Sequence, residues 1–276
     1  MDNKVAIIGN GWVGKAMQEL FPEAIVYVRN VDKSLELSLK ENDGLYKTTF
    51  TDDQQIINAS DFAFICVPTP AIGEGKLDVS AVEEVLKWCE VSNIIIRSTV
   101  NPGDCDRWQN QYPHKTILFQ PEYLGETPNH PLLDTVNTPF IVIGGDTKEH
   151  TQPLIDLYTT VYNANTKIRQ VTLLEAEVIK LSENRAIAWK VAQCQELYDV
   201  CVKAGVNYYT IREAVYSDDP RMNLWWTFVM PDKRGFQSKC IPKDVYAWCA
   251  WAESLGYPPV ITRTMLAKNK EWMEIS

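Results

Sequence analysis

The chain has 276 residues and a formal net charge of -9 at pH 7, with 45% hydrophobic and 23% charged residues. This composition is typical of a globular protein with a sizeable core, and the acidic balance argues against a nucleic-acid partner, which would need a basic face. No apolar run approaches the ~20 residues that cross a bilayer, so no membrane segment is expected. The N-terminus enters a strand almost at once, which leaves no room for a signal peptide.

The cysteines and histidines form no pattern of a disulfide framework or a metal site. The seven cysteines are scattered without a CxxC pair, and the three histidines lack metal-ligand spacing. We therefore expect reduced thiols, a cytoplasmic location and no bound metal.

The N-terminal region carries a dinucleotide-binding signature. Residues 5–8 form an apolar strand, residues 9–14 read Gly-Asn-Gly-Trp-Val-Gly, and residues 15–21 have a helical pattern. Gly9 permits a tight turn, Gly11 lets the backbone approach a pyrophosphate, and Gly14 lets the helix pack on the strand. The motif directly follows a strand, which is the context that it requires. The predicted cofactor site here comprises Gly9, Gly11, Trp12, Val13 and Gly14.

The end of the second strand, residues 24–28, leaves the choice of cofactor open. An NAD-binding protein usually has an acid about 20 residues after the motif opens, where it holds the ribose hydroxyls. Arg29 stands at this place and Asp32 follows it. Either Arg29 accepts the 2′-phosphate of NADP, or Asp32 binds the ribose of NAD, or Arg29 is merely solvated. We expect NAD first and NADP as the alternative.

The rest of the first half alternates apolar strands with helical segments. Further strands are expected at residues 62–67, 93–97, 115–119 and 140–143, and a capping-box sequence at Ser80 opens a helix that runs to Glu90. This alternation predicts a Rossmann-type, doubly wound parallel α/β sheet. Ligands of such sheets lie beyond the carboxyl ends of the strands. Thr69, Thr99 and Glu122 each follow such an end, so we expect them to line the cleft.

A change of composition near residues 163–170 suggests a domain boundary. We divide the chain into a dinucleotide-binding domain, residues 1–166, and an all-helical domain, residues 167–276. In the second domain, helices are expected at residues 206–216 and 245–255, and a last one after Pro258-Pro259.

The helical domain is predicted to be built on one long helix. A capping box at Thr172 opens a helical pattern that runs from Leu173 to Ala204. Lys180 and Asn184 lie on one face of it, together with Glu177. Polar residues on a helix are ordinarily a solvated surface, and a buried polar pair is the alternative.

Cys240 is the candidate nucleophile. Pro242 is a favoured first helical residue, so the thiol is expected just ahead of a helix N-terminus, where the dipole favours an anion. Lys239 and Lys243 add positive charge, and such surroundings lower the pKa of a thiol. Free cysteines are more often small buried hydrophobes. From this stretch alone, an activated thiol and a buried hydrophobe are equally supported.

Seven motifs occur in the order found in one enzyme family. They are Gly9-x-Gly11-x-x-Gly14, Val67-Pro68-Thr69-Pro70, Ser98-Thr99-Val100, Pro121-Glu122-Tyr123-Leu124, Glu177-x-x-Lys180-x-x-x-Asn184, Asp219-Pro220-Arg221, and the segment from Gly235-Phe236 to Cys240-x-x-Lys243-Asp244. Through these motifs the chain resembles the nucleotide-sugar dehydrogenases, the family of UDP-glucose 6-dehydrogenase. The resemblance implies oxidation of a sugar primary alcohol to an acid through an aldehyde, with two NAD per sugar.

The resemblance also implies roles for individual residues. Cys240 would attack the aldehyde to form a thiohemiacetal, and a second oxidation would leave a thioester. Lys180 and Asn184 would stabilise negative charge on the reacting oxygen. Asp244 and Thr99 would hold the catalytic water or support proton transfer, and Glu122 would assist thioester hydrolysis. Further cofactor contacts are implied for Val67, Pro68, Thr69, Ser98, Thr99 and Lys243. Substrate contacts are implied for Tyr123, Leu124, Glu126, Lys180, Asn184, Arg221 and Gly235.

Arg221 matches an arginine that reaches the substrate of a neighbouring subunit in the family. The resemblance therefore implies a homodimer through the helical domain. The family normally continues into a further doubly wound domain that holds much of the nucleotide. A separate chain that supplies this domain, a smaller substrate, and a degenerate or truncated relative are the three explanations for its absence here.

The chain also departs from the family's pattern beside the cysteine. Gln237, Ser238 and Lys239 stand where the family has two glycines and a serine, so side chains replace bare backbone near the substrate. Two alternatives to nucleotide-sugar oxidation follow. One is a simple two-electron β-hydroxyacid-type dehydrogenase that uses Lys180 and Asn184 without Cys240. The other is a non-catalytic dinucleotide-binding subunit.

Overall fold

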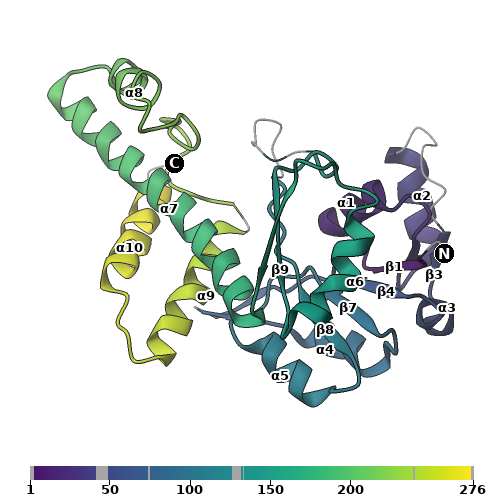
Figure 1. Cartoon of the computed structure of the whole chain (residues 1–276). Helices are drawn as coiled ribbons and strands as arrows, with labels where there is room; N and C mark the ends of the chain where they lie inside the picture. Colours follow the sequence, from purple (N-terminus) through teal and green to yellow (C-terminus); the bar gives the residue numbers. More distant parts are fainter. Residues whose placement is uncertain are drawn as a thin grey trace. The chain divides into compact units, whose positions relative to one another are not determined.

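The computed structural model describes residues 3–41, 49–73, 75–125, 132, 134–238 and 240–274, with the backbone alone for residues 37–41 (Figure 1). Two compact units make up the chain: one holds Met1–Pro70 and Leu77–Lys180, and the other Ala71–Lys76 and Leu181–Ser276. The division falls at Lys180 rather than at residue 166, because the strand β10 (Lys167–Val171) joins the sheet of the first unit.

An eight-stranded sheet forms the centre of the first unit. Besides β10, it contains β1 (Val5–Ile8), β2 (Ile25–Tyr27), β3 (Thr49–Thr51), β4 (Phe62–Ile65), β7 (Asn93–Ile96), β8 (Thr116–Phe119) and β9 (Phe140–Gly144). The order is β10-β9-β8-β7-β4-β1-β2-β3.

The predicted Rossmann-type sheet is confirmed, with one difference in strand direction. All neighbouring strands are parallel except β8 and β9. Consequently β9 and β10 run opposite to the other six strands, and the sheet is mostly rather than wholly parallel. The apolar run of β9 could not reveal this, because a strand buried on both faces has the same apolar pattern in either direction.

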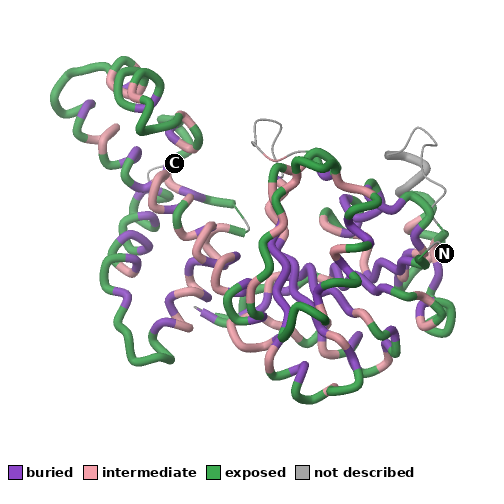
Figure 2. Tube along the Cα trace, in the orientation of Figure 1, coloured by how far each residue is buried: buried purple, intermediate pink, exposed green. Residues whose placement is uncertain are grey.

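Helices cover both faces of the sheet. They are α1 (Trp12–Leu20), α2 (Val31–Glu41), α3 (Gln54–Asn58), α4 (Ser80–Trp88), α5 (Asp104–Gln111) and α6 (Lys148–Tyr158). Ala6 and Ile8 pack into an apolar cluster with residues of α4 and α5, whereas Val5 and Ile7 pack into a second cluster with residues of α1 and α6. Successive side chains of a strand point to opposite faces, so the central strands are buried on both sides (Figure 2).

The two predicted capping boxes have different outcomes. At the start of α7 (Leu173–Ala204), Thr172 N donates to Glu175 Oε2 at 2.8 Å, and Glu175 N donates to Thr172 Oγ1 at 3.2 Å. This box is confirmed. The box at Ser80 is wrong, because Ser80 is already helical and Val79 occupies the cap position. Asp78 accepts the Ser80 N–H at 3.0 Å instead.

The second unit is helical. The long helix α7 has the predicted span, and α8 (Tyr208–Tyr216), α9 (Ile241–Ser254) and α10 (Val260–Glu274) follow it. Residues of α7, α9 and α10 share one apolar cluster, which includes Ala188, Val245 and Leu266. The short strands β5 (Ala71–Ile72) and β6 (Lys76–Leu77) pair with each other. None of the helices in the described part of the chain is long and apolar enough to cross a membrane.

Candidate active site

The turn between β1 and α1 shows what each glycine of the G-x-G-x-x-G motif does. Gly9 has a φ of +108°, and a Cβ on it would lie 2.5 Å from the carbonyl oxygen of Cys66. A Cβ on Gly14 would lie 2.1 Å from the carbonyl oxygen of Gly9, whereas a Cβ on Gly11 would meet nothing within 4 Å. The first and third glycines are therefore required by the fold. The second leaves open space at a helix N-terminus, which suits a pyrophosphate.

Trp12 and Val13, which stand between the second and third glycines of the motif, differ in their surroundings. Val13 is partly buried and packs against the second apolar cluster, so its main contact is with the core. Trp12 is 52% exposed at the first position of α1. Of the two, Trp12 is the side chain available to a ligand.

A polar pocket of about 530 Å³ follows β2. Arg29 and Asp32 both line it, Arg29 after the strand and Asp32 in the first turn of α2. Asn30 Oδ1 accepts the N–H of Lys33 at 2.9 Å and so fixes the start of that helix. A ribose in this pocket would meet a cation and a carboxylate together. The turn and the pocket thus fit a dinucleotide.

Hydrogen bonds tie together the segments that follow β4 and β7. Thr69 Oγ1 donates to the carbonyl oxygen of Thr99 at 2.7 Å, and Ser98 Oγ donates to the carbonyl oxygen of Val67 at 2.7 Å. Both donors are buried. Thr69 and Thr99 are therefore neighbours at the carboxyl edge of the sheet, and Ser98 holds the Val67 backbone in place.

Glu122 is held by an arginine that the sequence did not single out. Arg97 directly follows β7, is 4% exposed, and forms an ion pair with the Glu122 carboxylate. The other carboxylate oxygen accepts the backbone N–H groups of Tyr123 and Leu124, both at 2.7 Å. An arginine at the end of an otherwise apolar strand is the sequence signal for this contact, because a buried charge requires a partner.

The three polar residues expected on one face of α7 are buried rather than solvated. Glu177 is 1% exposed, and Lys180 and Asn184 are each 9% exposed. Glu177 accepts the backbone N–H groups of Gly103 at 2.6 Å and Cys105 at 2.8 Å, at the start of α5. Burial raises the pKa of the Glu177 carboxyl to about 7.

Lys180 lies beside the segment that carries Glu122. Its Nζ is 5.6 Å from the centre of the Tyr123 ring, a distance at which the ring face attracts a cation. Within the first unit, Lys180, Tyr123 and Glu122 thus belong to one neighbourhood.

In the second unit, Asp244 brings two of the expected site residues together. Asp244 is 1% exposed and lies in the first turn of α9. Its Oδ2 accepts from Asn184 Nδ2 at 2.5 Å, and its Oδ1 accepts from Lys243 Nζ at 2.7 Å. The carboxylate therefore orients the Asn184 amide, because only the amide nitrogen can donate to it.

Cys240 occupies the N-cap position of α9, and Pro242 follows within the first turn. The expectation of a thiol immediately before a helix N-terminus is thus confirmed. Cys240 is exposed, whereas the other six cysteines are buried. The alternative of a buried hydrophobe is therefore wrong for this residue.

The loop before Cys240 is fastened to α10. Asn269 Oδ1 accepts the N–H of Phe236 at 2.8 Å, and Asn269 Nδ2 donates to the Phe236 carbonyl oxygen at 3.2 Å. Gly235 has a φ of +74°, and a Cβ there would lie 2.6 Å from Asn269 Oδ1. Gln237 Nε2 donates to the carbonyl oxygen of Arg234 at 2.9 Å, and Ser238 Oγ accepts the N–H that opens α9 at 3.1 Å. The side chains that replace the family's glycines therefore have partners within the loop itself.

Three expected residues are not among the contacts described above. Arg221 is 83% exposed and binds Asp219 through two parallel hydrogen bonds, at 2.9 and 2.6 Å. Glu126, an expected substrate contact, and Lys239, expected beside the thiol, lie outside the described residues. Within the described ranges, no group of three His, Cys, Asp or Glu side chains could hold a metal ion.

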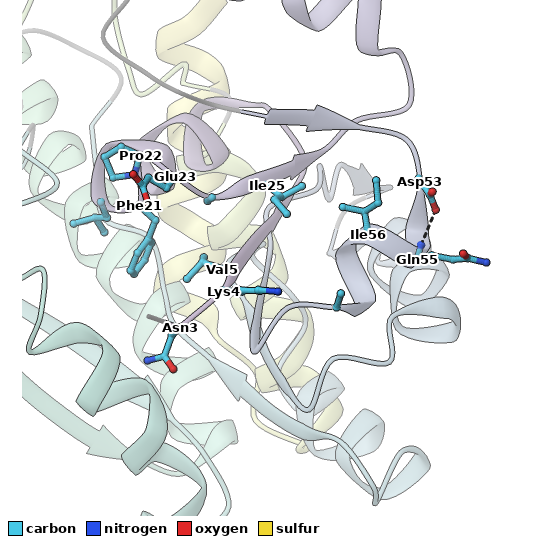
Figure 3. Close-up of a pocket in the computed structure, with 13 residues that line it drawn as sticks. Asn3, Lys4, Val5, Phe21, Pro22, Glu23, Ile25, Asp53, Gln55 and Ile56 are labelled. Atoms are coloured by element: carbon cyan, nitrogen blue, oxygen red, sulfur yellow. Dashed lines mark hydrogen bonds between the residues drawn. The ribbon is translucent and has the colours of Figure 1, made fainter. Parts of the chain in front are cut away.

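A large pocket of about 840 Å³ lies at the opposite edge of the sheet. It is lined by Lys4 and Val5 at the start of β1, by Ile25 at the start of β2, and by Phe21 and Ile56 (Figure 3). Doubly wound sheets bind their ligands at the carboxyl ends of the strands. This pocket is at the amino ends and is separate from the candidate site.

A glycine-rich turn that joins the carboxyl end of β1 to α1, within a mostly parallel sheet, defines a Rossmann-type dinucleotide-binding protein. Residues 31–162 match the NAD binding domain of the UDP-glucose/GDP-mannose dehydrogenase family, and residues 174–271 match its central domain. The chain belongs to this family. The match also confirms NAD as the expected cofactor.

Individual relatives support the same family. UDP-glucose 6-dehydrogenase of Rickettsia bellii is 26% identical over 268 residues, which cover 94% of this chain and 59% of that protein. UDP-glucose 6-dehydrogenase TuaD of Bacillus subtilis is 26% identical over 299 residues, with 97% and 63% covered. The chain thus spans about three fifths of the length of these curated relatives.

Solved structures share the fold. A UDP-glucose dehydrogenase of Pyrobaculum islandicum superposes with a TM-score of 0.81 at 23% identity, over 98% of this chain and 68% of that one. An NDP-N-acetyl-D-galactosaminuronic acid dehydrogenase of Methanosarcina mazei gives 0.71 at 19% identity, over 95% and 65%.

Proposed function

We propose that this chain acts as an NAD-dependent dehydrogenase that oxidises the primary alcohol of a nucleotide sugar to the uronic acid. The observation that carries the proposal is the succession of the two family domains along the chain, with Cys240 exposed at a helix N-terminus in the second. A UDP-glucose-like substrate is the expected one, because the relatives in Rickettsia and Bacillus are named for it.

In the first oxidation, Lys180 and Asn184 stabilise negative charge on the alcohol oxygen as the aldehyde forms. A buried ammonium and a buried amide N–H are strong stabilisers of such charge, since they act where water is scarce. Asn184 gives one N–H to Asp244 and keeps a second one for the oxygen. Bound NAD supplies the acceptor for the hydride in each oxidation.

The second oxidation takes place on Cys240. The thiolate sulfur adds to the aldehyde carbon, and the oxygen takes up a proton to give a thiohemiacetal. Loss of hydride from that carbon to NAD, and of the hydroxyl proton to water, leaves a thioester. The N-terminus of α9 favours negative charge on the attacking sulfur. The fixed loop formed by Gln237 and Ser238 limits the positions that the sulfur can take.

Water then cleaves the thioester to the acid and restores the thiol. Glu122 orients this water, and Thr99 and Asp244 assist the proton transfer. Additional cofactor contacts are proposed for Gly9, Gly11, Trp12, Arg29, Asp32, Val67, Pro68, Thr69, Ser98 and Lys243. Substrate contacts are proposed for Tyr123, Leu124, Glu126, Arg221 and Gly235.

We further propose a homodimer through the helical unit. Met222, Trp225, Phe228 and Met230 are each 48–58% exposed although they are large and apolar, and such a group on one segment is typical of an interaction surface. Arg221 directly precedes them and projects into solvent, which suits contact with a substrate bound to the second subunit. The seven reduced cysteines support a cytoplasmic setting.

The proposal is tested with purified protein, UDP-glucose and either NAD or NADP. Reduced nicotinamide is followed by absorbance and the uronic acid is quantified. We expect two reduced nicotinamides per acid, and loss of acid formation in Cys240→Ala. The matched control is Cys249→Ala, which removes a buried thiol from the same helix.

Other results would contradict the proposal in distinct ways. One reduced nicotinamide without acid, unchanged in Cys240→Ala, would favour the simple β-hydroxyacid-type dehydrogenase. Absence of turnover with intact NAD binding would favour a non-catalytic subunit or the need for a separate chain.

A further inference from the structure

Glu122 has little capacity left to accept hydrogen bonds. A carboxylate offers about four lone-pair positions on its two oxygens. The backbone N–H groups of Tyr123 and Leu124 occupy Oε1, and Arg97 Nη2 binds Oε2. The described residues thus take three positions and leave one position on Oε2.

Arg97 is itself held by the segment that it supports. Its Nη1 donates to the carbonyl oxygens of Gln120 at 3.2 Å and Pro121 at 3.3 Å. Burial is the largest single effect on the pKa of this guanidinium and lowers it, but Glu122, together with Tyr158, Tyr162 and Cys66, outweighs burial and the pKa is raised. One planar side chain therefore fixes both the backbone before Glu122 and the carboxylate.

A small cavity adjoins this pair. It has a volume of about 30 Å³, and Arg97, Gln120, Glu122 and Tyr162 are among the residues that line it. Arg97 Nε is buried and has no hydrogen-bond partner among the described residues. A cavity of this size has room for about one water molecule, and a water within reach of Nε would satisfy the orphaned N–H.

We propose that Arg97 is a positioning residue for Glu122, which it fixes so that a single acceptor position is available to one water molecule. This inference deepens the proposed function and rests on it for the identity of the step, which is thioester hydrolysis. A lysine could preserve the charge but not the contacts, since an ammonium cannot reach two carbonyl oxygens and a carboxylate in one plane.

The first test measures position without activity. In Arg97→Lys, we expect the backbone amides of Tyr123 and Leu124 to exchange with deuterium at least tenfold faster, because the freed carboxylate no longer accepts from them. The matched control is Lys115→Met, which removes another buried cation just before β8, and which should leave these amides unchanged. Unchanged exchange in Arg97→Lys would overturn the proposal.

A second comparison tests the same role if Arg97→Lys does not fold. Removing one partner of a buried ion pair is strongly destabilising, whereas replacing both is better tolerated. If Arg97→Lys does not fold, the double variant with Arg97→Met and Glu122→Gln is compared with the single variant Glu122→Gln. Faster exchange of residues 123–124 in the double variant supports the role of Arg97, and equal exchange refutes it.

The second test measures chemistry. We expect Arg97→Lys to lower kcat for acid formation at least tenfold with little change in KM, and to lower it no further when Glu122→Gln is already present. Independent, multiplicative effects of the two substitutions would refute action through Glu122. If Glu122→Gln alone leaves acid formation intact, the proposed function of Glu122 fails, and the exchange measurement still decides whether Arg97 positions it.

Discussion

The glycine-rich turn allows cofactor binding to be separated from folding by two alanine substitutions. In Gly14→Ala, the new methyl would lie 2.1 Å from the carbonyl oxygen of Gly9. The obstacle is backbone, so helix α1 must move away from the turn by about 1 Å. Overpacking of this kind costs about 3 kcal/mol, which corresponds to a Tm lower by roughly 6–12 °C in a chain of this size.

Gly11→Ala is the matched variant, because a Cβ there meets nothing within 4 Å. Alanine is a poorer N-cap than glycine, so we expect a stability loss of at most about 1 kcal/mol. The methyl would stand where the pyrophosphate approaches, and NAD affinity should fall roughly tenfold or more, about 1.4 kcal/mol.

Thermal unfolding, monitored by circular dichroism, measures the loss of stability. Calorimetric titration with NAD measures the loss of affinity. A Gly14→Ala protein that unfolds within 2 °C of the parent, on the order of the resolution of such scans, would refute the packing argument. A Gly11→Ala protein that binds NAD normally would refute the assignment of the open space.

Three further outcomes are expected. A bulky thiol reagent should modify one cysteine of the native protein rapidly, because Cys240 alone is exposed, and Cys240→Ser should abolish this phase; rapid modification of further thiols would contradict the burial. Burial raises the pKa of Glu177 to about 7 from 4.5, so its contribution to stability is fully present below pH 4.5 and is lost as the pH rises through 7. This contribution amounts to about 3 kcal/mol, and urea titrations should show that Glu177→Gln removes that dependence; an unchanged slope would speak against it. Asn269→Ala should lower the free energy of unfolding by about 2 kcal/mol, because two buried backbone groups of Phe236 lose their partner. It should also speed proteolysis of the loop before Cys240. A loop that resists proteolysis as in the parent would contradict a role for Asn269 in holding it.

Local sequence signals predicted those elements whose ends carry capping or terminating residues. The helix from Leu173 to Ala204 was predicted correctly because a capping box opens it and Gly205, with a φ of +69°, follows it. The helix Lys148–Tyr158 was missed, since it contains Pro153, which argues against a helix interior. The helix Asp104–Gln111 was missed because few of its residues are apolar.

The candidate site was predictable where residues follow strand ends and not where partners are distant. Thr69, Thr99 and Glu122 were found from their place after apolar runs. Arg97 and Asn269 were not, because their partners lie 25 and 33 residues away in the sequence. Such pairings are set by tertiary packing, which single-sequence patterns do not record.

The clamp between Asn269 and Phe236 has a consequence for synthesis. The loop that holds Cys240 is complete only after α10, which follows it in the chain, has left the ribosome and folded against it. A nascent chain that has already formed its dinucleotide-binding sheet therefore still has a loose thiol loop. Competence for covalent chemistry would thus be acquired only once α10 has folded, after the cofactor site exists.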